Sequence, residues 1–235
     1  MREKIVALVP AAGTGTRVGD SLPKQYLEVN GRPLIYHALA ALSRVSRIVR
    51  ICVVLSPEDK HWQLLMAESG TGFLPGPRVS TVSVGGASRG ESVLNGLNAL
   101  ADELRADDWV MVHDAARPCI RTELVEQFID ELEADPVGGL LALPLADTIK
   151  RDDGNLRVET TIAREGIWRA QTPQMFRYGM LRTAMQKMPA ATDEAQAIEA
   201  IGHQPKLVMG EGSNLKVTYA SDLKLARILL KEDGE

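Results

Sequence analysis

The sequence predicts an α/β protein built on a doubly wound, mostly parallel sheet of the Rossmann-like kind, with a β-arm protruding from it. Short apolar runs rich in Val, Ile and Leu recur along the chain and are nearly continuous, as in strands covered on both faces. Segments with helical spacing alternate with these runs, which favours a parallel sheet. One polar stretch, residues 147–168, interrupts the alternation and predicts the arm.

The expected elements follow from this pattern. The apolar runs that predict strands are IVALVPA, IVRICVVLS, VSTVSVG, WVMVHDA, LLALPLAD, PKLVMGE and LKVTYA. The segments that predict helices are residues 33–43, 57–69, 88–104, 121–133, 193–201 and 221–231. The residues expected to cap helices are Ser56 before Pro57, Ser88 with Glu91 at capping-box spacing, Thr192 and Ser221.

The stretch 147–168 is expected to form a polar hairpin with a turn at Asp152-Asp153-Gly154. A hairpin of this kind, projecting from a compact domain, serves as a flap or as an element of a dimer. The chain shows no repeat and no low-complexity linker, so residues 1–235 are expected to form a single domain that includes the arm.

The composition excludes several classes of protein. The 235 residues are 45% hydrophobic and 25% charged, which is ordinary for a globular chain, and the net charge of −4 gives no sign of a nucleic-acid binder. No run approaches the roughly 18 apolar residues of a membrane span, and no signal-type region precedes the first strand. Cys52 and Cys119 match no metal or redox spacing. We therefore expect a cytoplasmic protein with reduced thiols.

The residues just after each strand are the first candidates for a binding site, because ligands of such sheets bind beyond the carboxyl ends of the strands. After the first strand comes the loop Gly13-Thr14-Gly15-Thr16-Arg17-Val18-Gly19. It lacks the Gly-Lys-Ser/Thr ending of a P-loop, and its third glycine falls one position late for a dinucleotide fingerprint. A glycine turn still brings backbone N–H groups against a phosphate, which Arg17 and Lys24 would neutralise.

After the third strand comes Gly85-Gly86-Ala87-Ser88-Arg89-Gly90, which allows two interpretations. As a G-x-S-x-G elbow it predicts a serine hydrolase, but the available histidine, His203, has no evident partner acid. In the other interpretation the glycines let a planar base approach the backbone and Ser88 caps the helix. Arg89 then adds positive charge at the helix start, and Ser92 faces the ligand.

After the fourth strand comes His113-Asp114, followed by Arg117. An acid at the end of a central strand is partly desolvated, and a divalent metal or a substrate hydroxyl would satisfy it. The alternative is a turn cap paired with Arg117, and His113 is expected to be structural. Lys216 alternates with apolar neighbours in a short expected strand and by itself would be a solvated lysine.

These loops gather five cations, Arg17, Lys24, Arg89, Arg117 and Lys216, around one acid, Asp114. The sequence shows no cysteine–histidine pair, no HExxH and no zinc spacing. Many cations without covalent machinery indicate phosphoryl or nucleotidyl transfer, in which catalysis is positioning and charge neutralisation. A nucleotide-binding module without catalysis is the alternative from another class.

Four segments together, PAAGTGTRVGDSLPKQY, VHDAARP, TPQMF and NLKVT, resemble the 2-C-methyl-D-erythritol 4-phosphate cytidylyltransferases of the non-mevalonate isoprenoid pathway. The resemblance runs from the first strand to about residue 230 and includes the polar arm. The ribitol-5-phosphate cytidylyltransferases are similar over much of the same length and remain the alternative. The resemblance implies a nucleotidyltransferase fold and a Mg²⁺-dependent transfer of CMP from CTP to methylerythritol 4-phosphate by direct in-line attack, giving CDP-methylerythritol and pyrophosphate.

The resemblance also implies roles for individual residues. Those expected to cradle the cytidine are Ala11, Ala12, Gly13, Gly85 and Gly86, with Ser92 near the base and ribose. Arg17 and Lys24 would hold the triphosphate and the leaving pyrophosphate, and Lys216 would stabilise the five-coordinate phosphorus. Asp114 would serve the metal and a substrate hydroxyl beside Arg117.

On the arm, Thr148 and Arg164 would complete the acceptor-phosphate site of a second subunit, which implies a homodimer. The chain departs from the family at Ala87, where members can carry an acid. A contact made by the backbone at this position would survive the change, whereas a contact made by the side chain would not.

Overall fold

The computed structural model describes residues 3–13, 22–69 and 74–232. Its centre is a seven-stranded sheet in the order β11-β7-β10-β6-β1-β4-β5. These strands are β1 (Ile5–Pro10), β4 (Ile48–Val54), β5 (Val79–Val82), β6 (Trp109–Val112), β7 (Gly138–Pro144), β10 (Trp168–Arg177) and β11 (Lys206–Met209). All neighbours run parallel except β10, which is antiparallel to both β6 and β7. The prediction of a mostly parallel sheet is confirmed.

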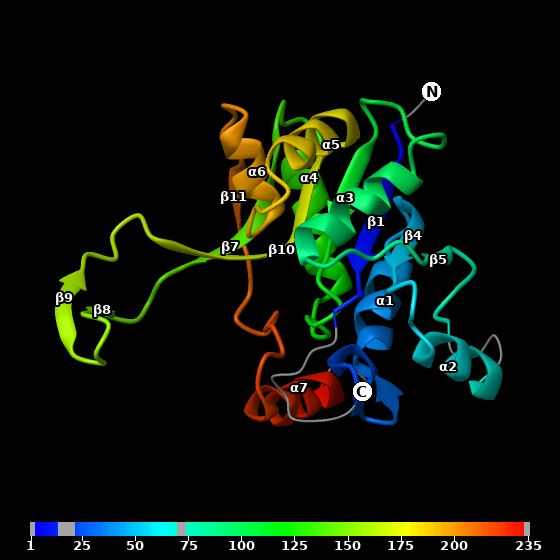
Figure 1. The fold of residues 1–235 in the computed structure, drawn as a ribbon, viewed down its shortest axis with the longest axis horizontal. Helices are drawn as coiled ribbons and strands as arrows, with labels where there is room; N and C mark the ends of the chain where they lie inside the picture. The colour runs from blue at the N-terminus through cyan, green and yellow to red at the C-terminus, as the bar shows by residue number, and fades with distance from the viewer. Residues whose placement is uncertain (1–2, 14–21, 70–73, 233–235) are drawn as a thin grey trace.

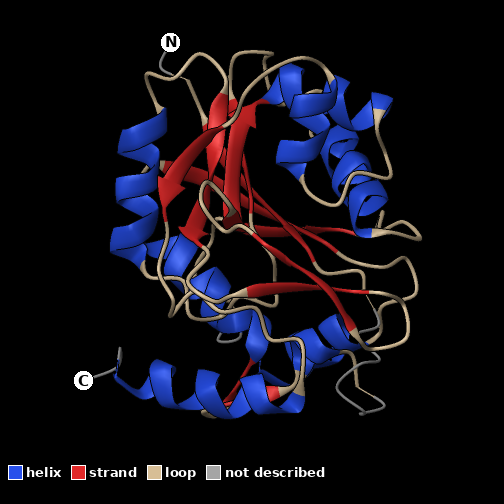
Figure 2. Ribbon diagram, turned by 90° about the vertical axis from the view of Figure 1, so that its left-hand side faces the viewer, coloured by secondary structure: helices blue, strands red, loops and turns tan. Residues whose placement is uncertain are grey.

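Helices cover both faces of the sheet (Figure 2). On one face, α1 (Leu34–Arg44), α2 (His61–Ser69) and α4 (Thr122–Leu132) share a buried apolar cluster with the sheet. On the other face, α3 (Arg89–Ala99), α5 (Tyr178–Lys187) and α6 (Glu194–Ala200) form a second cluster. Because the central strands β1, β4 and β6 are buried on both faces, their sequences read as nearly continuous apolar runs.

The helix α3 packs closely on the sheet because it carries a glycine at the contact. A Cβ added at Gly96 would lie 2.6 Å from Val54 Cγ2 and 2.9 Å from Leu8 Cδ1. This close approach fixes α3 over β1 and β4, and it therefore fixes the glycine loop that leads into the helix.

A smaller layer closes one end of the molecule. It consists of the short helix η2 (Lys24–Tyr26), the hairpin β2 (Glu28–Val29) and β3 (Arg32–Pro33), and the helix α7 (Ala220–Glu232). Val29, Leu34, Val217 and Ala226 form its buried cluster. Figure 1 shows α7 beneath the sheet, next to the early part of the chain.

The arm is the strands β8 (Ile149–Asp152) and β9 (Val158–Ile162), which pair only with each other in an antiparallel ladder. Most of its residues are exposed, and Leu156 at its tip is 94% exposed. Figure 1 shows the arm projecting far from the sheet on the left of the molecule. The predicted protruding hairpin is confirmed.

Three predicted helix starts or caps need correction. The helix α2 begins at His61 rather than at residue 57, and Asp59, not Ser56, caps it by accepting a hydrogen bond from Trp62 N at 2.9 Å. Asp193, not Thr192, caps α6. The last helix already starts at Ala220, so Ser221 lies inside it. The capping box is confirmed at its serine, since Ser88 Oγ accepts from Glu91 N at 3.1 Å.

One predicted strand was wrong, and two elements were not predicted. The run LKVTYA forms no strand, and within it Val217 N donates to the Ala116 carbonyl outside any ladder. Residues 171–174, which belong to no predicted strand, lie inside β10. A proline and polar side chains weaken the sequence signal of that strand, whose ladder with β7 shifts register between Ala170 and Gln174. The helix α5 was not predicted.

In the part of the chain that the structure describes, every helix is too short or too polar to cross a bilayer.

Candidate active site

A pocket of about 410 Å³ lies beyond the carboxyl ends of β1 and β6. Its walls are residues 10–13, 24–25, 86–89, Ser92, 114–116 and Lys216. The structure therefore brings together nine of the residues to which the sequence assigned a ligand or a charge, namely Ala11, Ala12, Gly13, Lys24, Gly86, Arg89, Ser92, Asp114 and Lys216. Arg17 lies outside the described residues.

Two glycine loops form one wall of the pocket, and they approach each other too closely for a side chain at Gly85. A Cβ added there would lie 2.2 Å from Ala12 Cβ and 2.8 Å from the Leu55 carbonyl oxygen. Gly85 N donates to that same carbonyl at 2.8 Å. Gly85 therefore acts through its contact with the first loop, behind the surface that lines the pocket.

Gln25 is a site residue that the sequence reasoning missed. Its side chain is 4% exposed, and its Nε2 donates to the carbonyl oxygens of Ala11 at 2.8 Å and Gly13 at 3.0 Å. A single amide thus holds both ends of the first pocket wall. The signal for it was its position directly after Lys24, in the PKQY segment.

Ser92 lines the pocket but uses its hydroxyl to shape the second loop. Its Oγ donates to the Ser88 carbonyl at 2.9 Å and accepts from Gly86 N at 3.0 Å. The hydroxyl of Ser88 is occupied as the cap of α3. The described part of the pocket lining contains no histidine, and His203 is exposed in the turn after α6. The hydrolase interpretation therefore lacks its base.

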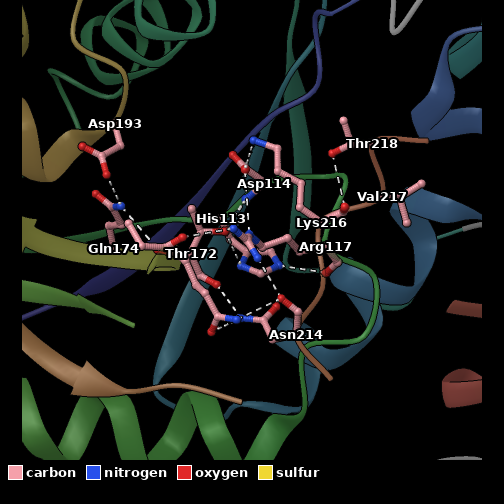
Figure 3. A network of polar contacts seen from close by, with 12 residues as sticks. His113, Asp114, Arg117, Thr172, Gln174, Asp193, Asn214, Lys216, Val217 and Thr218 are labelled. Carbon is pink, nitrogen blue, oxygen red and sulfur yellow. Dashed lines mark hydrogen bonds and ion pairs between the residues drawn. The ribbon is translucent and has the colours of Figure 1, made fainter. Parts of the chain in front are cut away.

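Asp114 is the centre of the charged group in the pocket. Arg89 Nε donates to its Oδ1 at 2.8 Å, and Lys216 Nζ lies 2.7 Å from its Oδ2 (Figure 3 shows the lysine contact). Burial would raise the pKa of this carboxyl, but the positive charges of Arg89 and Lys216 outweigh burial and hold the pKa well below its usual value. Asp114 is therefore ionised throughout the neutral range.

Arg89 has a second partner that the sequence reasoning did not assign. Its Nη1 and Nη2 donate to Glu194 Oε1 and Oε2 at 2.7 and 3.0 Å. Glu194 is completely buried at the first turn of α6. Arg89 thus spans two carboxylates, one in the segment after β6 and one in α6.

His113 and Arg117 lie behind the pocket. His113 Nε2 lies 3.1 Å from the Arg117 carbonyl oxygen, and burial lowers the pKa of the imidazole to about 4, so it is neutral at pH 7. Arg117 Nη1 donates to the Asn214 carbonyl at 2.7 Å. The Arg117 side chain does not line the pocket in the single chain, and instead holds the segment that leads to Lys216 (Figure 3).

Lys24 reaches the same segment from the other side, since its Nζ donates to the Val217 carbonyl at 3.3 Å. Thr148 and Arg164 lie at the base of the arm, and both are exposed. The Arg164 guanidinium donates to the Ala146 carbonyl on the other side of the hairpin. Neither arm residue lines the pocket of its own chain.

The described residues hold no group of three or more His, Cys, Asp or Glu side chains that could bind a metal by themselves. Asp114 is the carboxylate that reaches the described lining of the pocket. A mostly parallel sheet, glycine loops and cations around the buried acid Asp114 define a nucleotide-binding enzyme of the nucleotidyl-transfer class.

The comparisons with known proteins give the family. The family model described as IspD, 2-C-methyl-D-erythritol 4-phosphate cytidylyltransferase, matches residues 5–232, and the chain belongs to this family. The 2-C-methyl-D-erythritol 4-phosphate cytidylyltransferase of Dechloromonas aromatica is 53% identical, with 96% of each chain covered. That of Nitrosomonas eutropha is 50% identical, with 97% of each chain covered.

Solved structures share the fold. A crystal structure of 4-diphosphocytidyl-2C-methyl-D-erythritol synthase is 34% identical and superposes with a TM-score of 0.86, covering 98% of this chain and 100% of that one. The 2-C-methyl-D-erythritol 4-phosphate cytidylyltransferase of Francisella tularensis is 31% identical with a TM-score of 0.81, covering 97% and 100%.

Proposed function

We propose that the pocket described above transfers CMP from CTP to the phosphate of 2-C-methyl-D-erythritol 4-phosphate, giving CDP-methylerythritol and pyrophosphate. This is the activity of the family to which the chain belongs. The observation that carries the assignment to this pocket is the group formed by Asp114, Arg89 and Lys216 beside the two glycine loops. The matched family and the relatives described above name methylerythritol, and none of them names ribitol.

The chemistry needs no general base. The second pKa of a phosphate monoester is about 6, so the acceptor phosphate is mostly dianionic at pH 7. One of its oxygens attacks the α-phosphorus of CTP in line, a new P–O bond forms, and the bond to the β-phosphate breaks to release pyrophosphate. The histidine nearest the pocket, His113, is buried and neutral, and this reaction gives it no proton to carry.

The barrier is the approach of a dianion to a polyanion, so the required groups are cations held in place beforehand. Lys216 is proposed to stabilise the five-coordinate α-phosphorus, because Asp114 holds its ammonium at the pocket. Lys24, together with Arg17, is proposed to hold the triphosphate and the leaving pyrophosphate. Lys24 lies in the pocket wall next to the first loop.

The cytidine is proposed to bind at the two glycine loops. Ala11, Ala12, Gly13 and Gly86 line the pocket, and Gly85 lets the loops approach. Because Ser92 holds the backbone of Gly86 through its hydroxyl, its role is to shape the loop that would receive the base. If the cytidine contacts this loop through its backbone, the alanine at position 87 leaves that contact intact.

Mg²⁺ is part of the proposal. Proteins commonly hold this ion with one or two carboxylates plus substrate phosphates, and one carboxylate, Asp114, is available in the described lining of the pocket. Bound there, Mg²⁺ would neutralise triphosphate charge. Asp114 would also receive the acceptor's hydroxyl, with Arg117 fixing the neighbouring backbone. Each carboxylate oxygen has a second lone pair, so Asp114 can take up either ligand while it keeps its contact with Lys216.

We also propose that the enzyme is a homodimer and that the arm of each chain completes the acceptor site of its partner. Thr148 and Arg164 are exposed, and neither lines the pocket of its own chain, while the arm has almost no core of its own. The whole chain, residues 1–235, is taken as one cytidylyltransferase domain. Its two cysteines are buried and free, which suits the cytoplasm.

The experiment that tests the function is pyrophosphate release with CTP and Mg²⁺, comparing methylerythritol 4-phosphate with ribitol 5-phosphate. Release with the methylerythritol acceptor alone is expected. Release with ribitol phosphate alone would change the acceptor while leaving the site map intact. If the protein binds CTP but releases no pyrophosphate with either acceptor, it is a nucleotide-binding module without catalysis.

The dimer is tested by mixing two inactive variants, Arg164→Ala and Lys216→Ala. If Arg164 serves the partner's site, half of the randomly mixed dimers carry one intact site, and roughly a quarter of wild-type activity returns. If the mixture stays inactive although the subunits exchange, the arm does not act across the interface.

A further inference from the structure

Glu194, the buried carboxylate of α6, has no role in the function proposed above. It is completely buried, and it binds Arg89 with both oxygens at 2.7 and 3.0 Å. A buried, charged pair is expensive to form and is weak evidence for stability, so its place next to the pocket calls for another explanation. Hydrogen bonds to the residues on either side of Glu194 hold it in place.

Gln174, on β10, holds both neighbours of Glu194. Its Nε2 donates to Asp193 Oδ2 at 3.0 Å, and its Oε1 accepts from Ala195 N at 2.8 Å (Figure 3 shows the contact with Asp193). Gln174 is itself 1% exposed. The carboxylate of Glu194 is thus presented to Arg89 from a backbone that the central sheet holds rigidly.

The contact between Arg89 and Asp114 depends on this arrangement. In the orientation that Glu194 holds, the guanidinium contacts Asp114 through its Nε alone, which donates to Oδ1 at 2.8 Å. The other oxygen of Asp114 remains for Lys216, at 2.7 Å. An arginine without Glu194 would be able to turn and take both oxygens of Asp114 in the bidentate geometry that guanidinium and carboxylate favour. Lys216 would then lose its anchor.

We propose that Glu194 is a positioning residue for the transfer reaction: it fixes the orientation of Arg89 so that Asp114 keeps one oxygen for Lys216. This inference rests on the proposed function. Glu194 also contributes to the local charge. The three cations Arg89, Arg117 and Lys216 and the two carboxylates Asp114 and Glu194 together carry a net charge of +1. Neutralising Glu194 raises that charge to +2, which favours a bound triphosphate even as Lys216 is misplaced.

The test is the Glu194→Gln variant in the pyrophosphate-release assay. The expected result is a kcat at least about tenfold below wild type, while the KM for CTP does not rise, because the pocket gains positive charge. A merely loosened fold would raise KM as kcat falls. The matched control is Asp108→Asn, which neutralises another completely buried carboxylate bound to an arginine, Arg105, at the amino end of β6. Its kcat is expected to stay within twofold of wild type.

The path through Arg89 is tested by a double-mutant cycle. In an Arg89→Ala background, Glu194→Gln should cause no further loss of kcat, whereas the same fold-loss in both backgrounds would overturn the proposal. Arg89→Lys covers the case in which Glu194→Gln does not fold. It keeps the charge but cannot span both carboxylates in the same geometry, and it should lose kcat to a similar extent.

These outcomes separate the inference from the proposed function. The wild-type protein is assayed first. If it releases no pyrophosphate with either acceptor, the proposed function itself is refuted. An active wild type with a kcat for Glu194→Gln or Arg89→Lys within twofold of normal refutes only the role of Glu194.

Discussion

Gly85→Ala is the substitution whose effect can be worked out most directly from the structure. The added Cβ would lie 2.2 Å from Ala12 Cβ and 2.8 Å from the Leu55 carbonyl oxygen. Carbon atoms in contact are about 3.5–4.0 Å apart, so the two loops must separate by more than about 1 Å. Neither obstacle is the end of a flexible side chain, because Ala12 Cβ is fixed to its backbone and the Leu55 oxygen is backbone. The hydrogen bond from Gly85 N to Leu55 would stretch as well.

Overpacking of this kind costs about 1–3 kcal/mol. If the loops move apart, the cost appears in CTP binding as an increase in Kd of about 5- to 150-fold, at about 1.4 kcal/mol per factor of ten. If the loops resist, the cost appears in stability, and the Tm of a chain of this size falls by about 2–4 °C per kcal/mol. Titration calorimetry with CTP and a thermal unfolding scan measure the two parts.

The matched control is Gly212→Ala. A Cβ added at Gly212 meets nothing within 4 Å, and the substitution makes the same chemical change in an exposed turn. Its Kd for CTP and its Tm should match wild type. If Gly85→Ala behaves like this control in both measurements, the loops are not in the close contact described here, and the account of that pocket wall is wrong.

Three further predictions follow from the charged groups. Lys216→Ala should lower kcat in pyrophosphate release by about 100- to 1,000-fold without changing the far-UV circular dichroism, whereas near-normal turnover would remove it from the mechanism. Burial lowers the pKa of His113 from 6.5 to about 4, so the unfolded chain protonates first and stability falls as pH drops through that window, by on the order of 3 kcal/mol. Urea unfolding at pH 7 and pH 4.5 should show a smaller loss for His113→Gln than for wild type, and an equal loss would refute this linkage. Chelation of divalent ions should abolish turnover, and added Mg²⁺ should restore it; full turnover in excess chelator would rule out the metal.

Much of the site was predictable because of one property of parallel sheets. The carboxyl ends of β1 and β6 lie side by side at one edge, so the residues that follow them, Ala11 to Gly13 and Asp114, had to meet. The apolar runs that mark these strands are continuous because helices cover both faces. The polarity of residues 147–168 likewise predicted an element outside the core, since an apolar face is what would have packed it against the sheet.

The strand β10 could not be predicted from the hydrophobic pattern of the sequence. It lies between β6 and β7, antiparallel to both, although its middle is the polar segment Gln171-Thr172-Pro173-Gln174. Its polar side chains are satisfied by groups far along the chain, such as Asn214 and Asp193. Hydrophobic periodicity cannot reveal a strand whose burial depends on such partners.

By itself, the sequence determined the α/β class, the arm and the loops that carry the chemistry, because burial and turn formation are local properties of the chain. Only the tertiary structure decided which polar groups hold those loops. Gln25 braces the first loop, and Glu194 binds Arg89 across 105 positions of sequence. The partners of a buried polar side chain depend on which strands and helices come together, and no local pattern in the sequence records that order.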